Sequence, residues 1–445
     1  MKPALLLPLL LIAGPAASQV AQRQAARDDI VLVGRPGDPA RVALPTVERL
    51  FDGYVRDGKM PGIVGAFGIG DRPTWFLASG AISREPQARF VDADTLWRIY
   101  SMTKPVTGMA AMMLIEEGRI GLDDPVSKYI PAFGKMRVAT NPAASLASVP
   151  ATRPITIRHL LTHTGGLGYS ITAKGPLLKE YERLGLLPLA INEAAEARMR
   201  LVRPRTLEEF ADRAATVPLV AQPGTAWNYS IGLDVLGRVI EVASGMPFDR
   251  FLSLRLFGPL GMRSTYFTVP SADRERLATS YAILGKTFAP VDTGPGSVFL
   301  RSPSFPYGGA GLVSSARDYD RFLTMLANGG TVGGARIMKA ETVRLALSNL
   351  LPAGVTFGGA GAVTGTGATA RMGYGAGGFV TLTDQLGGLR AGSYGWNGAA
   401  GTVAWVDPAR RMRATIMVNY SPGTLYPLSQ ETGRALAADL QRLSR

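Results

Sequence analysis

The sequence predicts an α/β protein in which both ends of the chain build one sheet-plus-helix domain beside a mainly helical middle. Strand-like segments occur in pairs around tight turns near both ends, and an amphipathic helix accompanies each pair. The middle of the chain is richer in helical periods and in Pro and Gly breaks. The 445 residues, 46% hydrophobic and 18% charged, suffice for a large core in one big domain or two closely packed ones.

The first residues have the pattern of a secretory signal peptide. Lys2 gives a positive start, residues 4–13 form an apolar stretch, and small residues at 16–18 resemble a cleavage site. We therefore expect residues 1–18 to be a signal peptide, 19–41 to be a flexible lead-in, and the mature protein to be periplasmic or secreted. No cysteine is present for lipid attachment, and no later segment is a membrane-span candidate, so we expect no stable membrane insertion after cleavage.

Regular elements follow in order. Residues 45–58 have helical spacing, and residues 63–70 and 74–80 alternate like two strands around a turn at 71–73. Residues 402–406 and 412–419 form a matching pair around a turn at 407–409, and an amphipathic helix at 428–443 follows. These patterns predict a sheet domain from residues 42–100 and 286–445, and a mainly helical domain from residues 101–285.

Three irregular stretches interrupt these elements. Residues 139–154 predict a long surface loop, residues 168–204 an irregular segment with a helical patch at 191–201, and residues 354–378 a glycine-rich segment. Loops of this length are often functional. The sequence leaves open whether 168–204 covers a site.

Composition restricts the chemistry. Without cysteine, disulfides, thiolate metal sites and a cysteine nucleophile are excluded. The 48 basic and 34 acidic residues give a net charge of +14, but the arginines are scattered, so we expect no nucleic-acid partner. The two histidines, His159 and His163, lie four residues apart without the acidic third ligand of a metalloprotease motif, which favours a structural pair; we expect neither metal nor cofactor.

The strongest chemical signal is Ser101 followed by Lys104, leading into a helical stretch at 108–117 that Gly118 ends. In a helix that begins at the serine, these side chains lie on one face, so the lysine amine reaches the hydroxyl. A serine nucleophile requires a base, and a lysine serves only in the neutral form that burial favours. Taken alone, the motif also fits a serine helix cap followed by a solvated lysine.

Further motifs accompany this one. In order they are LDDPVSKYIP at 122–131, IRHLLTHTGGL at 157–167, PGTAWNYSI at 223–231, GGAGLVSSARD at 308–318 and GWNGAAG at 395–401. With them the chain resembles the serine β-lactamase-like superfamily, specifically the group of class C β-lactamases, D,D-peptidases and family VIII carboxylesterases. The resemblance covers about residues 47–440. It implies the β-lactamase/penicillin-binding-protein fold, an antiparallel sheet flanked by helices plus a mainly helical domain, with the active site between them.

The resemblance also assigns roles. Ser101 matches the acylated nucleophile, Lys104 its partner, and Tyr229 the tyrosine that shuttles protons with the lysine. Residues Trp396, Asn397 and Gly398 stand where the family has its K-T-G triplet, and the backbone N–H groups of Ser101 and Ala399 match the oxyanion hole.

Two departures from the penicillin-recognising pattern bear on the substrate. Ile231 replaces an asparagine that would bind a lactam side chain, and Trp396 replaces a cation that would hold the lactam carboxylate. Both changes favour a neutral ester or an acyl chain, as in family VIII esterases, although Arg390 could supply a cation. Tyr100 and Trp227, each near a proposed catalytic residue, are either core or pocket wall. The residues that we predict to bind the substrate are these two together with Ile231, Trp396, Asn397 and Gly398.

These observations predict a serine hydrolase that cleaves carboxylic esters through a Ser101 acyl-enzyme, acting on a small-molecule ester or amide. The alternatives are a β-lactamase, D-stereospecific peptidase or amidase, or acyltransferase on the same site, and a non-catalytic penicillin-binding-like module. Ser393 lies in a near match to a nucleophile elbow, but neither histidine follows it. Acyl chain length, leaving group, stereospecificity and oligomeric state are not determined by the sequence.

Overall fold

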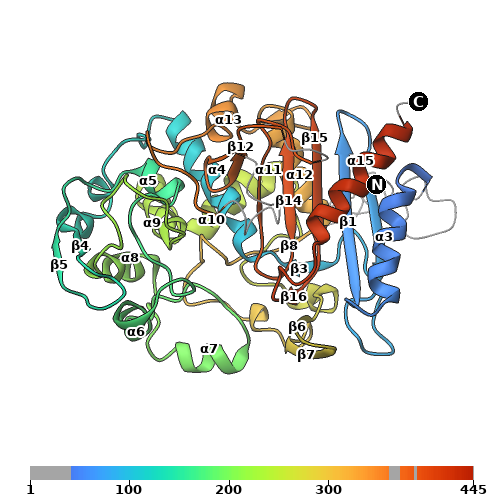
Figure 1. Cartoon of the computed structure of the whole chain (residues 1–445), viewed down its shortest axis with the longest axis horizontal. Helices are drawn as coiled ribbons and strands as arrows, with labels where there is room; N and C mark the ends of the chain where they lie inside the picture. The colour runs from blue at the N-terminus through green and yellow to red at the C-terminus, as the bar shows by residue number, and fades with distance from the viewer. Residues whose placement is uncertain (1–41, 360–370, 385–387, 444–445) are drawn as a thin grey trace, which may run out of the picture.

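The computed structural model describes residues 42–359, 371–384 and 388–443. Its centre is a seven-stranded sheet in which every neighbouring pair is antiparallel. The strands lie in the order β11 (Met372–Tyr374), β12 (Phe379–Thr381), β13 (Tyr394–Asn397), β14 (Val403–Asp407), β15 (Met412–Met417), β1 (Gly62–Ile69) and β2 (Trp75–Gly80). The sheet therefore joins both ends of the chain, and with its flanking helices it confirms the predicted fold class (Figure 1).

Helices cover both faces of the sheet. On one face lie α3 (Pro45–Arg56) and α15 (Leu428–Leu443), which pack against each other. On the other face lie α12 (Ala316–Ala327) and α4 (Thr103–Glu116). Alternation along β1 explains this layering, because Ile63 and Phe67 enter the core under α3 and α15 whereas Val64 enters the larger core on the opposite face.

The terminal elements lie close to their predicted bounds. The four predicted strands begin and end within about two residues of the observed β1, β2, β14 and β15, and α15 spans the predicted residues 428–443. Tight turns at 71–73 and 407–409 delimit the strands and α15 has helical spacing, so local sequence was sufficient to define these segments. The division into domains at residues 100 and 285 stays a prediction.

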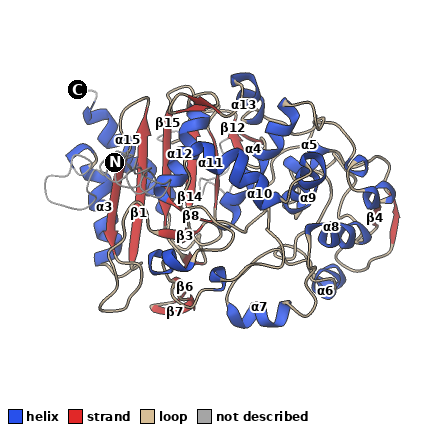
Figure 2. Cartoon of the chain, turned by 180° about the vertical axis from the view of Figure 1, so that it is seen from behind, coloured by secondary structure: helices blue, strands red, loops and turns tan. Residues whose placement is uncertain are grey.

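The helical region lies beside the sheet and surrounds α4 (Figures 1 and 2). Its helices are α5 (Ile157–Leu161), α6 (Gly175–Arg183), α7 (Glu193–Met199), α8 (Leu207–Thr216), α9 (Gly232–Ser244), α10 (Phe248–Leu252) and α11 (Gly258–Leu260). The predicted helical patch at 191–201 contains α7. Helix α6 lies in a segment predicted as irregular. Its nine residues are amphipathic, with Leu177 and Tyr181 buried four positions apart, a spacing that the prediction overlooked.

Short elements complete the chain. Small sheets pair β3 (Leu96–Arg98) with β8 (Val313–Ser315), β4 (Arg137–Ala139) with β5 (Ser148–Pro150), β9 (Thr331–Val332) with β10 (Ala335–Arg336), and β6 (Ser280–Leu284) with β7 (Thr287–Asp292) and β16 (Tyr420–Ser421). Helix α13 (Ala340–Ala346) packs near α4. The predicted loop at 139–154 thus includes part of the β4–β5 hairpin.

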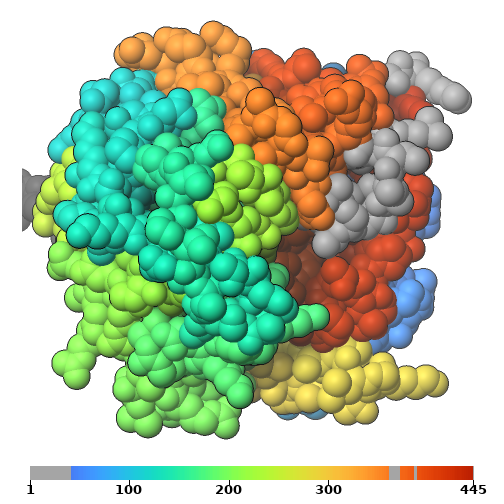
Figure 3. All heavy atoms as spheres, turned by 60° about the vertical axis from the view of Figure 1, so that its left-hand side comes forward, coloured from blue at the N-terminus to red at the C-terminus, as the bar shows by residue number. Residues whose placement is uncertain are grey.

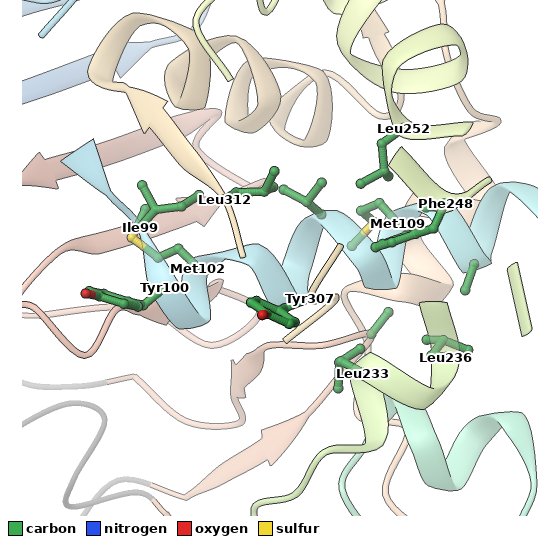
Figure 4. Packing of buried hydrophobic residues seen from close by; sticks show 14 of the residues in the cluster. Ile99, Tyr100, Met102, Met109, Leu233, Leu236, Phe248, Leu252, Tyr307 and Leu312 are labelled. Carbon is green, nitrogen blue, oxygen red and sulfur yellow. The ribbon is translucent and has the colours of Figure 1, made fainter. Parts of the chain in front are cut away.

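Helix α4 is buried along nearly its whole length. Its residues from Thr103 to Leu114 are all buried, and the methionines at 109, 112 and 113 belong to the core. Figure 4 shows this packing, with Met102 and Met109 at the helix and Leu233 and Leu236 on α9. A helix held from all sides is a rigid base for the serine that precedes it.

Candidate active site

Ser101 lies at the junction between β3 and α4, in a short 3-10 turn (Tyr100–Met102). The residue before it, Tyr100, has φ +40°, a left-handed backbone conformation that side chains other than glycine rarely adopt. Burial of the Tyr100 ring against Phe299, with ring centroids 6.3 Å apart, holds this conformation in place. The turn leaves Ser101 partly exposed at the start of a buried helix.

The strand before the serine is anchored by a buried arginine. Arg98 has no exposed surface, and its guanidinium donates to Asp292 Oδ2 at 2.7 Å and to Ser297 Oγ at 3.0 Å. Its backbone N–H donates to Asn419 Oδ1 at 3.1 Å. These bonds tie β3 to the segment after β7 and to the end of the sheet, so they fix the position of the serine turn.

The structure brings the three predicted catalytic side chains together. The Lys104 amine donates to Ser101 Oγ at 3.2 Å, and the Tyr229 hydroxyl donates to the same oxygen at 2.8 Å. These distances are within hydrogen-bond range, so either group is placed to exchange a proton with the serine. The roles of the three residues in catalysis stay a prediction.

Lys104 is enclosed by protein. It has no exposed surface, and its amine donates to the carbonyl oxygen of Gly309 at 2.7 Å. The amine also lies 4.6 Å from the ring centroid of Tyr229 and 5.5 Å from that of Tyr169. The carbonyl oxygen and both ring faces are groups that attract a cation.

Aromatic rings surround Tyr229 and fix its orientation. Trp227 stacks on it with ring centroids 6.0 Å apart and an interplanar angle of 17°, and Trp396 lies 5.8 Å away. The indole N–H of Trp396 donates to the Tyr229 hydroxyl at 3.4 Å, a long bond that leaves the phenol free to donate to Ser101. The ring contacts therefore hold the Tyr229 side chain, and its hydroxyl is directed at Ser101 Oγ.

The two histidines have separate positions. His159 lies in α5, where its Nδ1 accepts from the Thr156 N–H at 3.2 Å in a capping box. His163 lies beyond the end of α5 with φ +57°, buried, with its ring 4.8 Å from the Tyr229 ring. Burial lowers the pKa of His159 to about 4 and the pKa of His163 well below its usual value, the Lys104 charge adding to the latter shift. Both rings are therefore neutral at neutral pH.

The predicted oxyanion segment lies next to the serine turn. Gly398 follows β13, and a Cβ at this position would lie 2.6 Å from the carbonyl oxygen of Ile99, so only glycine permits this close approach. The Gly398 N–H donates to the Thr402 carbonyl at 2.8 Å, and Ala399 is exposed. The oxyanion role of the Ser101 and Ala399 N–H groups stays a prediction.

The predicted substrate-binding residues divide into two groups. Asn397, Gly398 and Trp227 are partly exposed. Gly398 lies against the residue that precedes the serine turn and Trp227 stacks on Tyr229, whereas Asn397 lines a cavity beside α15. Trp396 and Tyr100 are largely buried, and burial raises the pKa of Tyr100 to about 12. Ile231 has no exposed surface and packs in the main core before α9, so its side chain presents no surface to a ligand in this structure.

The competing nucleophile and cation lie elsewhere. Ser393 is fully buried, and its hydroxyl has no hydrogen-bond partner among the residues that the structure describes. Arg390 lines a cavity of about 840 Å³ together with Arg434 and Leu440 of α15, which covers the sheet face opposite to α4. Over the described ranges, no cluster of three or more histidine, aspartate or glutamate side chains could hold a metal ion, and no helix is long and apolar enough to cross a membrane.

Three residues near the serine were not predicted from the sequence. Gly309 binds Lys104, and Tyr169 lies beside both Lys104 and Tyr229. Asp234, on the buried side of α9, accepts the Gly309 N–H at 2.8 Å. The Gly308–Gly309 pair was a visible motif, but Asp234 follows the start of an apolar helix, where an acidic residue is ordinary.

The space-filling view shows a hollow between the green segments of the helical region and the red C-terminal segments, in keeping with an accessible face between the two parts of the chain (Figure 3).

Comparison with known proteins gives consistent matches. Residues 47–439 match the family model described as Beta-lactamase. The chain is 33% identical over 300 residues to esterase EstB of Burkholderia gladioli, which covers 64% of this chain and 70% of EstB. It is 31% identical over 341 residues to a lovastatin esterase of Penicillium rubens, covering 73% of this chain and 78% of the relative.

A solved structure agrees in architecture. EstCE1, described as a hydrolase with promiscuous acyltransferase activity, superposes with a TM-score of 0.70 at 26% sequence identity. The match covers 89% of this chain and 99% of EstCE1.

Proposed function

The chain belongs to the beta-lactamase family and is a serine hydrolase, and from that premise we propose that it cleaves carboxylic esters through an acyl-enzyme on Ser101. The observation that carries the proposal is the convergence of two proton-transfer groups on one hydroxyl. Lys104 and Tyr229 contact Ser101 Oγ at 3.2 and 2.8 Å. Each of these side chains comes from a different part of the fold, and buried neighbours hold both.

The proposed reaction has two steps. Ser101 Oγ attacks the ester carbonyl while its proton passes to the Tyr229–Lys104 pair, and the oxyanion that forms is bound by the Ser101 and Ala399 N–H groups. Collapse of the intermediate expels the alcohol, which takes the proton, and leaves the acyl group on Ser101. Water then attacks the acyl carbon and gives a proton to the same pair; the bond to Ser101 Oγ breaks, the pair returns the proton to Oγ, and the carboxylic acid is released.

The surroundings support a neutral ester as substrate. Trp396 stands where a lactam-binding cation is expected, and it is almost fully buried beside Tyr229. Arg390 lines a cavity beside α15, which Asn397 also lines. A β-lactam carboxylate would therefore find an indole and no cation at position 396.

Acyl transfer is a second candidate, favoured by the hydrolase EstCE1, whose description includes promiscuous acyltransferase activity. The first step is common to both reactions. An alcohol in place of water would take the acyl group from Ser101, so the accepting molecule alone separates the two activities.

The test is a parallel assay of p-nitrophenyl esters of graded acyl length and a chromogenic cephalosporin, with Ser101→Ala as control. We expect rapid ester turnover, weak lactam cleavage, and no turnover by the variant. A second series with added alcohols, analysed for the new ester, measures transfer. Dominant lactam cleavage would refute the ester preference, and undiminished ester turnover by Ser101→Ala would refute the mechanism.

We further propose export of the protein to the periplasm or the medium, after cleavage near Ser18. The residues that carry this prediction, 1–41, lie outside the described residues. Sequencing the N-terminus of the protein from cell fractions tests it. A mature chain that begins near Gln19 in the periplasm or medium is expected, and an intact N-terminus in the cytoplasm would contradict it.

A further inference from the structure

Asp234 is an ionisable group in the interior that the proposed mechanism does not use. It lies near the start of α9 with no exposed surface. Its Oδ1 accepts the backbone N–H of Gly309 at 2.8 Å, whereas Oδ2 has no hydrogen-bond partner among the described residues. A buried carboxylate with an unpaired oxygen is destabilising unless a nearby charge compensates for it.

The compensating charge is that of Lys104, which lies on the other side of Gly309. The Gly309 carbonyl oxygen accepts from the Lys104 amine at 2.7 Å. One glycine thus joins the carboxylate to the amine, its N–H on Asp234 and its C=O on Lys104. Both side chains are excluded from solvent, so their attraction is screened less than that of a surface pair.

The contact also requires glycine. A Cβ at position 309 would lie 2.6 Å from Asp234 Oδ2, and a Cβ at position 308 would lie 2.4 Å from the Leu233 carbonyl oxygen. The Gly308–Gly309 motif therefore lets this backbone pass against the start of α9. Close approach at both positions keeps the carboxylate against the peptide that binds Lys104.

We propose that Asp234 is a positioning residue that acts through the Gly309 peptide, holding its carbonyl on Lys104 and setting the charge state of the amine. The proposal rests on the proposed function only for its readout, which is ester turnover. Two effects are separable: the hydrogen bond to Gly309 orients the peptide, and the negative charge stabilises the ammonium form of Lys104.

Other titratable groups also face Asp234 and Lys104. Burial raises the pKa of Asp234 to about 7, while the Lys104 charge and the Gly309 hydrogen bond oppose that rise. The remaining titratable groups that face Asp234 or Lys104 are Tyr169, Tyr229, Tyr307 and His163. Burial raises the pKa of Tyr169 and Tyr307 and lowers that of His163, so these three stay neutral near pH 7, and Asp234 supplies a negative charge above its raised pKa.

The deciding variant is Asp234→Asn, which can still accept the Gly309 N–H but carries no charge. The pH profile of kcat/KM for a p-nitrophenyl ester is measured for the variant and the wild type. Loss of the carboxylate destabilises the ammonium, so Lys104 releases its proton at lower pH. Whichever form of the amine is active, the limb of the profile that reports it moves to lower pH, by about one unit.

Asp318→Asn is the matched control. Asp318 is also a buried carboxylate, which accepts from the Ser264 N–H at 2.6 Å and from Thr265 Oγ1 at 2.9 Å, but it contacts neither Lys104 nor Gly309. We expect its profile to match that of the wild type. Thermal unfolding of each variant shows that it is folded, and Asp234→Ser, which keeps a hydroxyl acceptor, replaces Asp234→Asn if the latter does not fold.

A folded, charge-free variant whose profile keeps the wild-type midpoints, or moves to higher pH, would overturn the proposal. An equal shift in Asp318→Asn would also overturn it, because loss of a buried carboxylate that does not contact Gly309 would then move the profile just as much. Failure of the proposed function is distinguishable, since it is recognised by ester turnover that does not depend on Ser101.

Discussion

Replacing Tyr229 by phenylalanine removes a single oxygen from the contacts of Ser101 while leaving the ring in place. The lost hydroxyl donates to Ser101 Oγ at 2.8 Å and accepts from Trp396 at 3.4 Å. The ring contacts with Trp227, Trp396 and His163 do not depend on this oxygen. The change therefore tests proton transfer rather than packing.

The expected magnitudes differ for activity and for stability. A positioned acid–base group contributes about 10²- to 10⁴-fold to rate, so kcat/KM should fall by that factor, or about 3 to 5 kcal/mol of barrier. The phenol makes one good hydrogen bond and one long one, so the free energy of unfolding should fall by no more than about 1.5 kcal/mol. The assay is ester turnover together with urea unfolding of the same preparations.

Tyr374→Phe is the matched control for this experiment. Tyr374 is fully buried, its ring lies 5.1 Å from that of Trp396, and its hydroxyl has no hydrogen-bond partner within the described ranges. We expect this variant to keep near wild-type activity. If Tyr229→Phe retained more than about a tenth of the wild-type kcat/KM, or both variants lost activity equally, proton transfer by Tyr229 would be refuted.

Two further predictions concern stability. Arg98→Met leaves the buried Asp292 carboxylate without its partner, so the free energy of unfolding should fall by about 3 to 5 kcal/mol in urea unfolding; a loss under about 1 kcal/mol would show that the ion pair does not anchor β3. Because burial lowers the pKa of His159 from 6.5 to about 4, the unfolded chain binds a proton that the folded chain does not between these values, and stability falls as the pH drops through this window. Between pH 7 and pH 4.5, the free energy of unfolding should fall by about 2 kcal/mol less in His159→Gln than in the wild type. An identical fall in both proteins would contradict the lowered pKa of His159.

Local sequence predicted the elements that turn residues or helical spacing delimit. Tight turns at 71–73 and 407–409 separate β1 from β2 and β14 from β15, and α15 has helical spacing, so the predicted bounds were close to those observed. Helix α6 was missed, although Leu177 and Tyr181 are buried four positions apart.

In the candidate site, too, contacts between residues close in sequence were predictable, whereas contacts between distant segments were not. Ser101 and Lys104 are linked by helical spacing, so their contact followed from the sequence, whereas Tyr229 was identified by resemblance to a family motif. Asp234 could not be found in this way, since its proximity to Lys104 depends on two separate chain segments that meet at Gly309. Ile231 was expected to face a ligand, but the start of α9 turns its side chain into the core.

The most direct test of the account is identification of the acylated residue. The purified protein is mixed with a p-nitrophenyl ester, quenched in acid during turnover, digested, and analysed by mass spectrometry, with Ser101→Ala treated in parallel. We expect the acyl mass on Ser101 in the wild type and no acylated peptide in the variant. An acyl group on another residue, or turnover by Ser101→Ala at the wild-type rate, would contradict the central claim.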